Sequence, residues 1–135
     1  MKYELKKISG DASFREFYRL KRNNQTSIIV LAQKEKFKNL AVYTVINNVL
    51  NNNRINAPKL ISNHYKNSVI EISDLGENTL FDRVITKKNK LNSYKSIIKY
   101  LIKIQKIKVK KIYKFRNLKI KIPKYTLSNL HKESD

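Results

Sequence analysis

The chain of 135 residues contains no cysteine, no tryptophan, two prolines and only two glycines. Without cysteine it can form neither a disulfide nor a thiolate metal site, which fits the reducing conditions of the cytoplasm. The two histidines, His64 and His131, lie too far apart in the sequence to suggest a metal cluster. The longest purely apolar run, Ile28 to Ala32, is far shorter than the roughly 20 residues that a membrane-spanning helix needs. We therefore expect a soluble, cytoplasmic protein of one domain, or of one lobe and part of another.

Acidic residues are also scarce, with 10 Asp and Glu beside 30 Lys and Arg, which gives a net charge of +20. Residues 84–132 hold sixteen of the basic residues and no acid. Such a surplus ordinarily indicates nucleic acid or an anionic membrane as the partner. Lysine is accompanied here by abundant isoleucine and asparagine, which A/T-rich codons also encode, so compositional drift is an alternative. A third explanation is a cut surface that once faced acidic partners that are missing. The charge alone does not decide between these three explanations.

Apolar residues in the first two thirds of the chain follow two different periods. Alternating or continuous short apolar runs, separated by Asn-rich or Lys-Asn turns, predict antiparallel strands. Apolar residues at three-and-four spacing predict a helix that is buried on one side and that Asn51 to Asn53 terminates. The strands are expected at residues 3–8, 14–20, 27–33, 59–65 and 68–75, and the helix at residues 37–52.

Both glycines lie next to expected strands, at Gly10 and Gly76. Glycine accepts a positive φ and lets another group approach the backbone, so a chain this poor in glycine is expected to keep it for compulsory turns. The first turn comprises Ser9, Gly10, Asp11, Ala12 and Ser13, and the second follows Glu71, Ile72, Ser73, Asp74 and Leu75. We interpret the first as a loop over phosphates and the second as the end of an adenine-binding segment. An ordinary hairpin turn at the first, and a turn or helix-cap role for Asp74, are the alternatives.

Three short motifs occur in a fixed order along this pattern. They are G-D-A-S-F-R at residues 10–15, A-P-K-L at residues 57–60 and D-L-G at residues 74–76, the last followed by Thr79-Leu80. Together they resemble the aminoglycoside phosphotransferase family, and within it the branch that contains bacterial kinases of N-acetylmuramate and N-acetylglucosamine. The resemblance covers residues 1–86 and fades through the lysine-rich remainder.

The resemblance implies an α+β fold with a kinase-like amino-terminal lobe, a five-stranded antiparallel sheet plus one helix, over residues 1–76. Residues 77–135 would begin a helical carboxy-terminal lobe that is incomplete. The implied function is transfer of the ATP γ-phosphate to a sugar hydroxyl, with Mg²⁺ held by the missing lobe. Ser9 to Ser13 would cover the phosphates. Glu71 would begin the adenine-binding segment, in which Ile72 to Asp74 pair with the base through backbone groups and Leu75 helps to sandwich the ring.

Two features depart from kinase patterns. The expected strand at residues 27–33 has no lysine and the helix at residues 37–52 has no glutamate, so the ion pair that protein kinases place on the phosphates is absent. Lys34 or Lys36 is a candidate to reach a phosphate instead, with a solvated lysine as the alternative. The chain also has no His-x-Asp loop, and phosphotransfer needs carboxylates to orient the hydroxyl and to hold Mg²⁺. We therefore assign no catalytic residue and expect an inactive fragment.

The lysine-rich region after residue 90 has its own helical pattern. An apolar stripe comprises Tyr94, Ile97, Ile98, Leu101 and Ile104, and a basic face comprises Lys95, Lys99, Lys103, Lys106 and Lys110. Lysines four residues apart repel one another, so packing against other parts of the protein must stabilise this helix. We interpret it as the first long helix of the second lobe, followed by an extended connector at residues 118–123. A membrane-surface helix has the same periodicity, so a basic module that binds nucleic acid or an anionic membrane is the alternative function.

Overall fold

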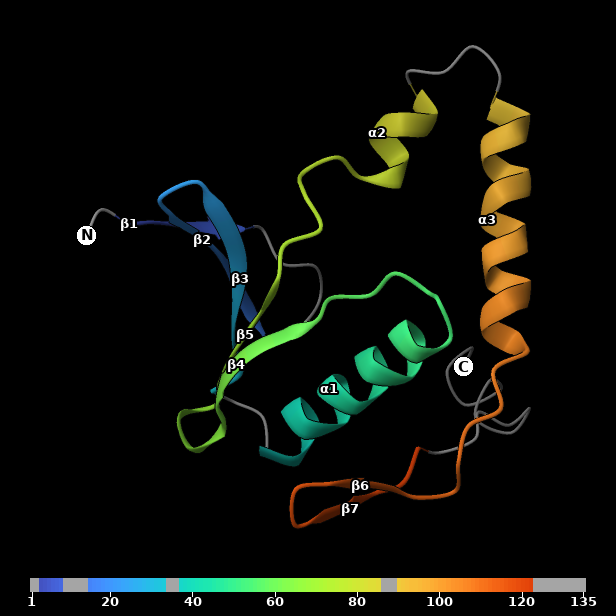
Figure 1. The fold of residues 1–135 in the computed structure, drawn as a ribbon. Coiled ribbons are helices and arrows are strands. Elements are labelled where there is room, and N and C mark those ends of the chain that lie inside the picture. Colours follow the sequence, from blue (N-terminus) through green and yellow to red (C-terminus); the bar gives the residue numbers. More distant parts are fainter. Residues whose placement is uncertain (1–2, 9–14, 34–36, 86–89, 123–135) are drawn as a thin grey trace, which may run out of the picture.

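The computed structural model describes residues 3–8, 15–33, 37–85 and 90–122, which form an α+β fold with a five-stranded antiparallel sheet (Figure 1). The strand order is β1-β2-β3-β5-β4, and β6 and β7 form a separate hairpin. The elements are β1 (Tyr3–Ile8), β2 (Glu16–Arg22), β3 (Gln25–Leu31), α1 (Phe37–Asn52), β4 (Leu60–His64), the 3-10 turn η1 (Tyr65–Asn67), β5 (Val69–Ser73), α2 (Leu80–Ile85), α3 (Lys90–Gln105), β6 (Tyr113–Phe115) and β7 (Leu118–Ile120). The α+β class and the five-stranded antiparallel sheet that the sequence predicts are confirmed.

The turns of the sheet use residues that tolerate left-handed backbone. Asn23, between β2 and β3, has a φ of 54°, which asparagine adopts more easily than most residues. Ser68, after η1, has a φ of 55°, and its N–H donates to the carbonyl of Tyr65. The Asn-rich turn and the turn around Lys66 and Asn67 are therefore confirmed.

One face of the sheet packs on α1. Val30 of β3 and Ile70 of β5 are fully buried and share a core cluster with Leu40 of α1. Toward the opposite end of the same face the β2 residues become charged, with Arg19 opposite Ile28 and Lys21 opposite Thr26. In Figure 1, α1 lies beside only one part of the sheet. This face, called the α1 face below, therefore has an apolar part under the helix and a charged part beyond it.

The β6-β7 hairpin packs on the other side of α1. Ile120 has no exposed surface and forms a cluster with Ala41 and Val45 of α1. Phe115 meets the ring of Tyr65 edge-on, with 5.9 Å between the ring centroids. The sequence predicted an extended connector at residues 118–123. Residues 118–120 are extended, but they are one strand of a hairpin and part of a second hydrophobic cluster.

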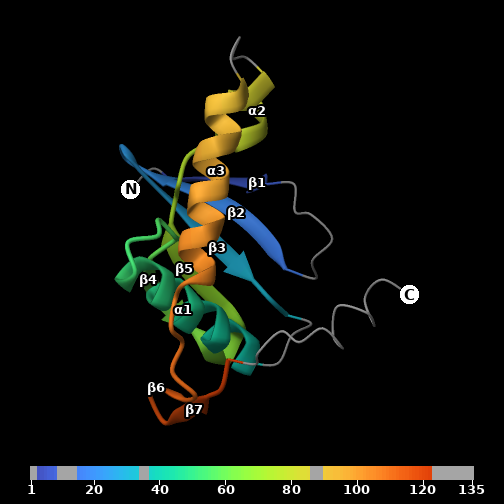
Figure 2. The same cartoon turned by 90° about the vertical axis from the view of Figure 1, so that its right-hand side faces the viewer.

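Helix α3 stands away from the sheet in Figure 1, and in the view of Figure 2 it passes in front of the sheet. All of its residues are described and none is buried, and Tyr94, Ile98 and Leu101 of the predicted apolar stripe are more than half exposed. One contact with the rest of the molecule is a hydrogen bond from Lys103 Nζ to the carbonyl of Arg54, at 2.9 Å. Among the described residues α3 contacts α2, but it has no buried residue, so the close packing that the sequence requires for this helix is not found there. The helix also ends at Gln105, earlier than the predicted Lys110.

Among the helices of the described ranges, none is both long enough and apolar enough to cross a membrane.

Candidate functional site

The predicted phosphate loop, Ser9 to Ser13, lies outside the described residues, as do Lys34 and Lys36. Their predicted roles therefore stay predictions. The strands on either side of the loop are described, and Ile8 at the end of β1 pairs with Phe17 of β2. Both side chains pack against the core on the α1 face. The described strand ends on either side of the loop therefore lie beside the apolar part of that face.

The predicted adenine-binding segment begins in a central strand. Ile72 of β5 pairs with Ile28 of β3 on one side and with Leu60 of β4 on the other, and the N–H of Ser73 donates to the carbonyl of Lys59 at 2.8 Å. Beyond the strand, the hydrogen bonds of the described residues leave the backbone N–H and C=O of Leu75 unpaired, and this residue is 56% exposed. Within this segment, backbone groups are therefore available to a ligand at Leu75 and not at Ile72.

Asp74 forms a paired salt bridge with Arg19 of β2. Arg19 Nε donates to Asp74 Oδ2 at 2.6 Å, and Nη2 donates to Oδ1 at 3.1 Å. The side chains are 6% exposed for Asp74 and 18% exposed for Arg19. The N–H of Gly76 also donates to Asp74 Oδ1, at 2.9 Å, which closes the turn after β5. Asp74 therefore has the turn role that the sequence left open as an alternative.

The hydrogen bonds from Arg19 hold the pKa of the Asp74 carboxyl below its usual value. Burial acts in the opposite direction, while the Gly76 N–H, the positive charge of Arg19 and the Thr26 hydroxyl also lower the pKa. The carboxylate therefore stays ionised at neutral pH and keeps its full attraction for the guanidinium. Such a group serves to hold the backbone in place and not to accept a proton.

Arg19 makes two further contacts with the segment after β5. Its Nη1 donates to Glu77 Oε1 at 2.6 Å, and its Nη2 donates to the carbonyl of Gly76 at 3.1 Å. Glu77 is 75% exposed, so its ion pair is screened by water, whereas the pair with Asp74 is nearly buried. We call this set of contacts, from Arg19 to Asp74, Gly76 and Glu77, the Arg19 clamp. It fixes the start of the linker between β5 and α2 to the second strand of the sheet.

Glu71 points away from this site. Its Oε1 accepts a hydrogen bond from the Ser27 hydroxyl at 2.6 Å, and its Oε2 accepts one from the Ser62 hydroxyl at 3.0 Å. Side chains alternate along a strand, so Glu71 and Asp74 belong to opposite faces of the sheet. The structure does not bring these two predicted site residues together, and the side chain of Glu71 serves to tie β3 and β4 to β5.

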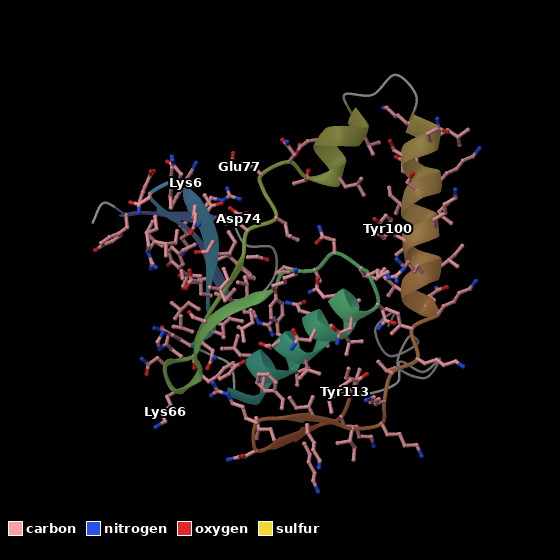
Figure 3. The ribbon with its side chains drawn as sticks, in the orientation of Figure 1. Lys6, Lys66, Asp74, Glu77, Tyr100 and Tyr113 are labelled. Atoms are coloured by element: carbon pink, nitrogen blue, oxygen red, sulfur yellow. The ribbon has the colours of Figure 1, made fainter. Side chains whose placement is uncertain are left out.

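A hollow of about 270 Å³ lies beside the Arg19 clamp on the charged part of the α1 face. It is lined by Glu4, Lys6, Arg19, Lys21, Thr26 and Glu77. Figure 3 shows Lys6, Asp74 and Glu77 together at this end of the sheet. Glu4, Lys6 and Arg19 were not predicted as site residues. The signal was present, because Glu4 and Lys6 of β1, and likewise Arg19 and Lys21 of β2, lie two residues apart and must share a face.

Within the described ranges, no three His, Asp or Glu side chains converge as a metal site would require. The expectation that Mg²⁺ ligands come from a missing lobe stays a prediction.

Gly76 is the one position of the linker whose backbone requires glycine. Its φ is 96°, and a Cβ added there would meet no atom within 4 Å. We therefore expect Gly76→Ala to lower the free energy of unfolding through backbone strain alone, by about 1 kcal/mol. Urea unfolding of the variant measures this loss, with Asn78→Ala, also in the exposed linker, as the control. Equal stability of the two variants would show that Gly76 does not hold this conformation in solution.

Comparison of the chain with models of protein families, with curated proteins and with solved structures gave no significant match.

Proposed function

We propose that the chain is the ATP-binding part of a small-molecule phosphotransferase that transfers the γ-phosphate of ATP to a hydroxyl of an amino sugar. The nucleotide would lie on the α1 face, between the loop at residues 9–13 and the linker that begins at Asp74. Without a carboxylate loop of the His-x-Asp type, the chain alone would bind nucleotide and transfer no phosphate.

The observation that carries this proposal is the arrangement of the elements around the two turns. Three strands, a helix and two strands follow one another, and β5 lies inside the sheet between β3 and β4. The chain therefore leaves the middle of the sheet after Ser73, next to the charged end of the α1 face. This is the arrangement that a kinase-like amino-terminal lobe uses to present backbone groups to adenine. Two of the three motifs that resemble the phosphotransferase family belong to these connections, residues 10–15 between β1 and β2 and residues 74–76 after β5.

The free backbone of Leu75 supports a specific position for the base. Its N–H and C=O can pair with the edge of a purine, and its exposed side chain can cover one side of the ring. The Arg19 clamp holds Leu75 between two fixed residues, Asp74 and Gly76. Binding would then cost little backbone ordering, because the linker is already in place.

Titration of the isotope-labelled chain with Mg-ATP, followed by NMR, tests the proposal. We expect amide shifts of residues 72–77 and of residues 15–17, which follow the loop, with saturation at millimolar nucleotide. Pyrophosphate, which lacks the base, should leave residues 72–77 unshifted and serves as the control.

The basic helix α3 offers the competing function, because its lysines are exposed and its apolar stripe has little cover among the described residues. If residues 72–77 stay silent while a polyanion shifts residues 95–106 with a steep dependence on salt, the nucleotide proposal is wrong and the basic-module function is favoured.

A further inference from the structure

A second hollow, of about 480 Å³, lies at the other end of β5. It is lined by Asn63, His64, Tyr65, Lys66, Asn67 and Arg116. Figure 3 shows Lys66 far from Asp74 and Glu77, at the opposite end of the sheet. The five residues of β5 separate the two hollows by about 16 Å at the usual rise of a strand. This hollow is therefore distinct from the hollow beside the Arg19 clamp, and the inference below does not depend on the proposed nucleotide site.

Among the residues that the structure describes, the lining of this hollow has positive charge and no carboxylate. Lys66 and Arg116 supply two cations, and the side chains of Asn63 and Asn67 supply amide groups. The hollow beside Arg19 differs in this respect, because Glu4 and Glu77 line it together with the cations. A ligand in the second hollow would meet hydrogen-bond donors without a competing negative charge, which suits an anion.

Arg116 is held in place without losing its charge. Its guanidinium carbon lies 5.2 Å from the centroid of the Tyr65 ring, and its Nη2 donates to Asn63 Oδ1 at 2.8 Å. Neither partner is an acid, so the positive charge is not neutralised as that of Arg19 is. The guanidinium has more N–H donors than this one bond uses, and its planar fork fits a phosphate or carboxylate group.

The elements that present Arg116 are themselves anchored. Arg116 belongs to the turn between β6 and β7 and has a φ of 52°. Ile120 fixes this hairpin to α1, and the edge-on contact of Phe115 fixes it to Tyr65, which is 4% exposed. The Arg116 side chain therefore has little conformational freedom left to lose when a ligand binds, and its position is preorganised.

We infer that this hollow binds the phosphate groups of a small phosphorylated compound. Arg116 contacts one phosphate with its planar fork, and Lys66 on the facing turn contacts a second as a compact charge. The volume lies within the range of sites for small molecules. The net charge of +20 raises the local concentration of such anions, and the hollow supplies the geometry that a diffuse surface lacks.

Isothermal titration of the full chain with inorganic tripolyphosphate tests this inference. We expect a saturable site, separate from any binding at the proposed phosphate loop, which Arg116→Gln weakens about tenfold and Lys66→Gln about threefold, as expected for lost charge-assisted hydrogen bonds. Lys95→Gln on α3 removes the same charge outside the hollow and should change the affinity less than twofold. Arg116→Lys, which keeps the charge and loses the fork, should fall between Arg116→Gln and the unmodified chain.

The Lys66 variant keeps the test decisive if Arg116→Gln unfolds the hairpin, because the described structure shows no hydrogen bond or ion pair of the Lys66 side chain. Equal losses in Lys66→Gln and Lys95→Gln would overturn the inference, since binding would then follow net charge alone. It would also be overturned if tripolyphosphate showed no saturable site while a single-stranded RNA bound the chain and lost affinity equally in Lys66→Gln and Lys95→Gln.

Discussion

Asp74→Ala is expected to lower the free energy of unfolding by about 2 to 3 kcal/mol at neutral pH. The substitution leaves the guanidinium of Arg19, only 18% exposed, without its nearly buried partner, and removal of one member of a buried pair costs several kcal/mol. It also removes the acceptor for the Gly76 N–H. Urea unfolding of the variant and of the unmodified chain measures the difference. Glu77→Gln, which breaks only the exposed ion pair of the clamp, should cost less than about 0.5 kcal/mol.

The effect of Asp74→Ala should depend on pH with a defined sign. Arg19 lowers the pKa of the Asp74 carboxyl in the folded state, whereas in the unfolded chain it is near its ordinary value of about 3.9. The carboxylate therefore contributes its full stability above about pH 4 and loses it as the pH falls through the lower, folded pKa. We expect the difference between the unmodified chain and the variant to narrow below about pH 4. A difference that stays constant on acidification would contradict the salt bridge.

The second large effect is expected for Ile120→Ala, which should lower the free energy of unfolding by about 3 kcal/mol. Ile120 is completely buried between the hairpin and α1, so the shorter side chain loses apolar contact and leaves a cavity. Loss of this anchor should also shift the NMR signals of Tyr65 and Phe115, whose rings meet at the other end of the hairpin.

Val109→Ala is the matched control for Ile120→Ala, because it removes carbon from a side chain that is 47% exposed. It should change the stability by less than about 0.5 kcal/mol. If both variants unfold at the same urea concentration, the hairpin is not docked on α1 in solution, and the preorganisation of Arg116 is lost with it.

The sheet and its helix could be predicted from the sequence because each element is long enough to show the spacing of its apolar residues. Five strands and α1 have enough apolar positions to distinguish alternation from three-and-four spacing. A helical segment was expected after residue 77, but the bounds of the short helix α2 were not predicted although a local signal exists. Thr79 Oγ1 accepts from the N–H of Asp82, and the N–H of Thr79 donates to the carboxylate of Asp82, as in a capping box.

The β6-β7 hairpin could not be predicted in the same way. The alternation at residues 118–123 predicted an extended segment, but its partner strand, Tyr113–Phe115, has only three residues and carries too short a pattern to predict the pairing. What identifies the hairpin is the contact of Ile120 with α1, which joins residues far apart in the sequence.

The candidate site was predictable only in part. The sequence singled out Asp74 and Gly76, and the structure places both at the turn after β5. Their partner Arg19 lies 55 residues before Asp74, and a single sequence has no signal for such a pair. The separation of Glu71 from Asp74, in contrast, follows from the alternation of a strand and could have been stated beforehand.

The central claim, that the α1 face and the linker together receive a purine nucleotide, is tested most directly by contacts between the base and assigned methyl groups. Nuclear Overhauser effects from the adenine protons of bound Mg-ATP should reach the methyl groups of Leu75, the exposed linker residue that the proposal places against the base. Contacts with Leu5, which belongs to the opposite face and is 54% exposed, or with the apolar residues of α3, would contradict the claim.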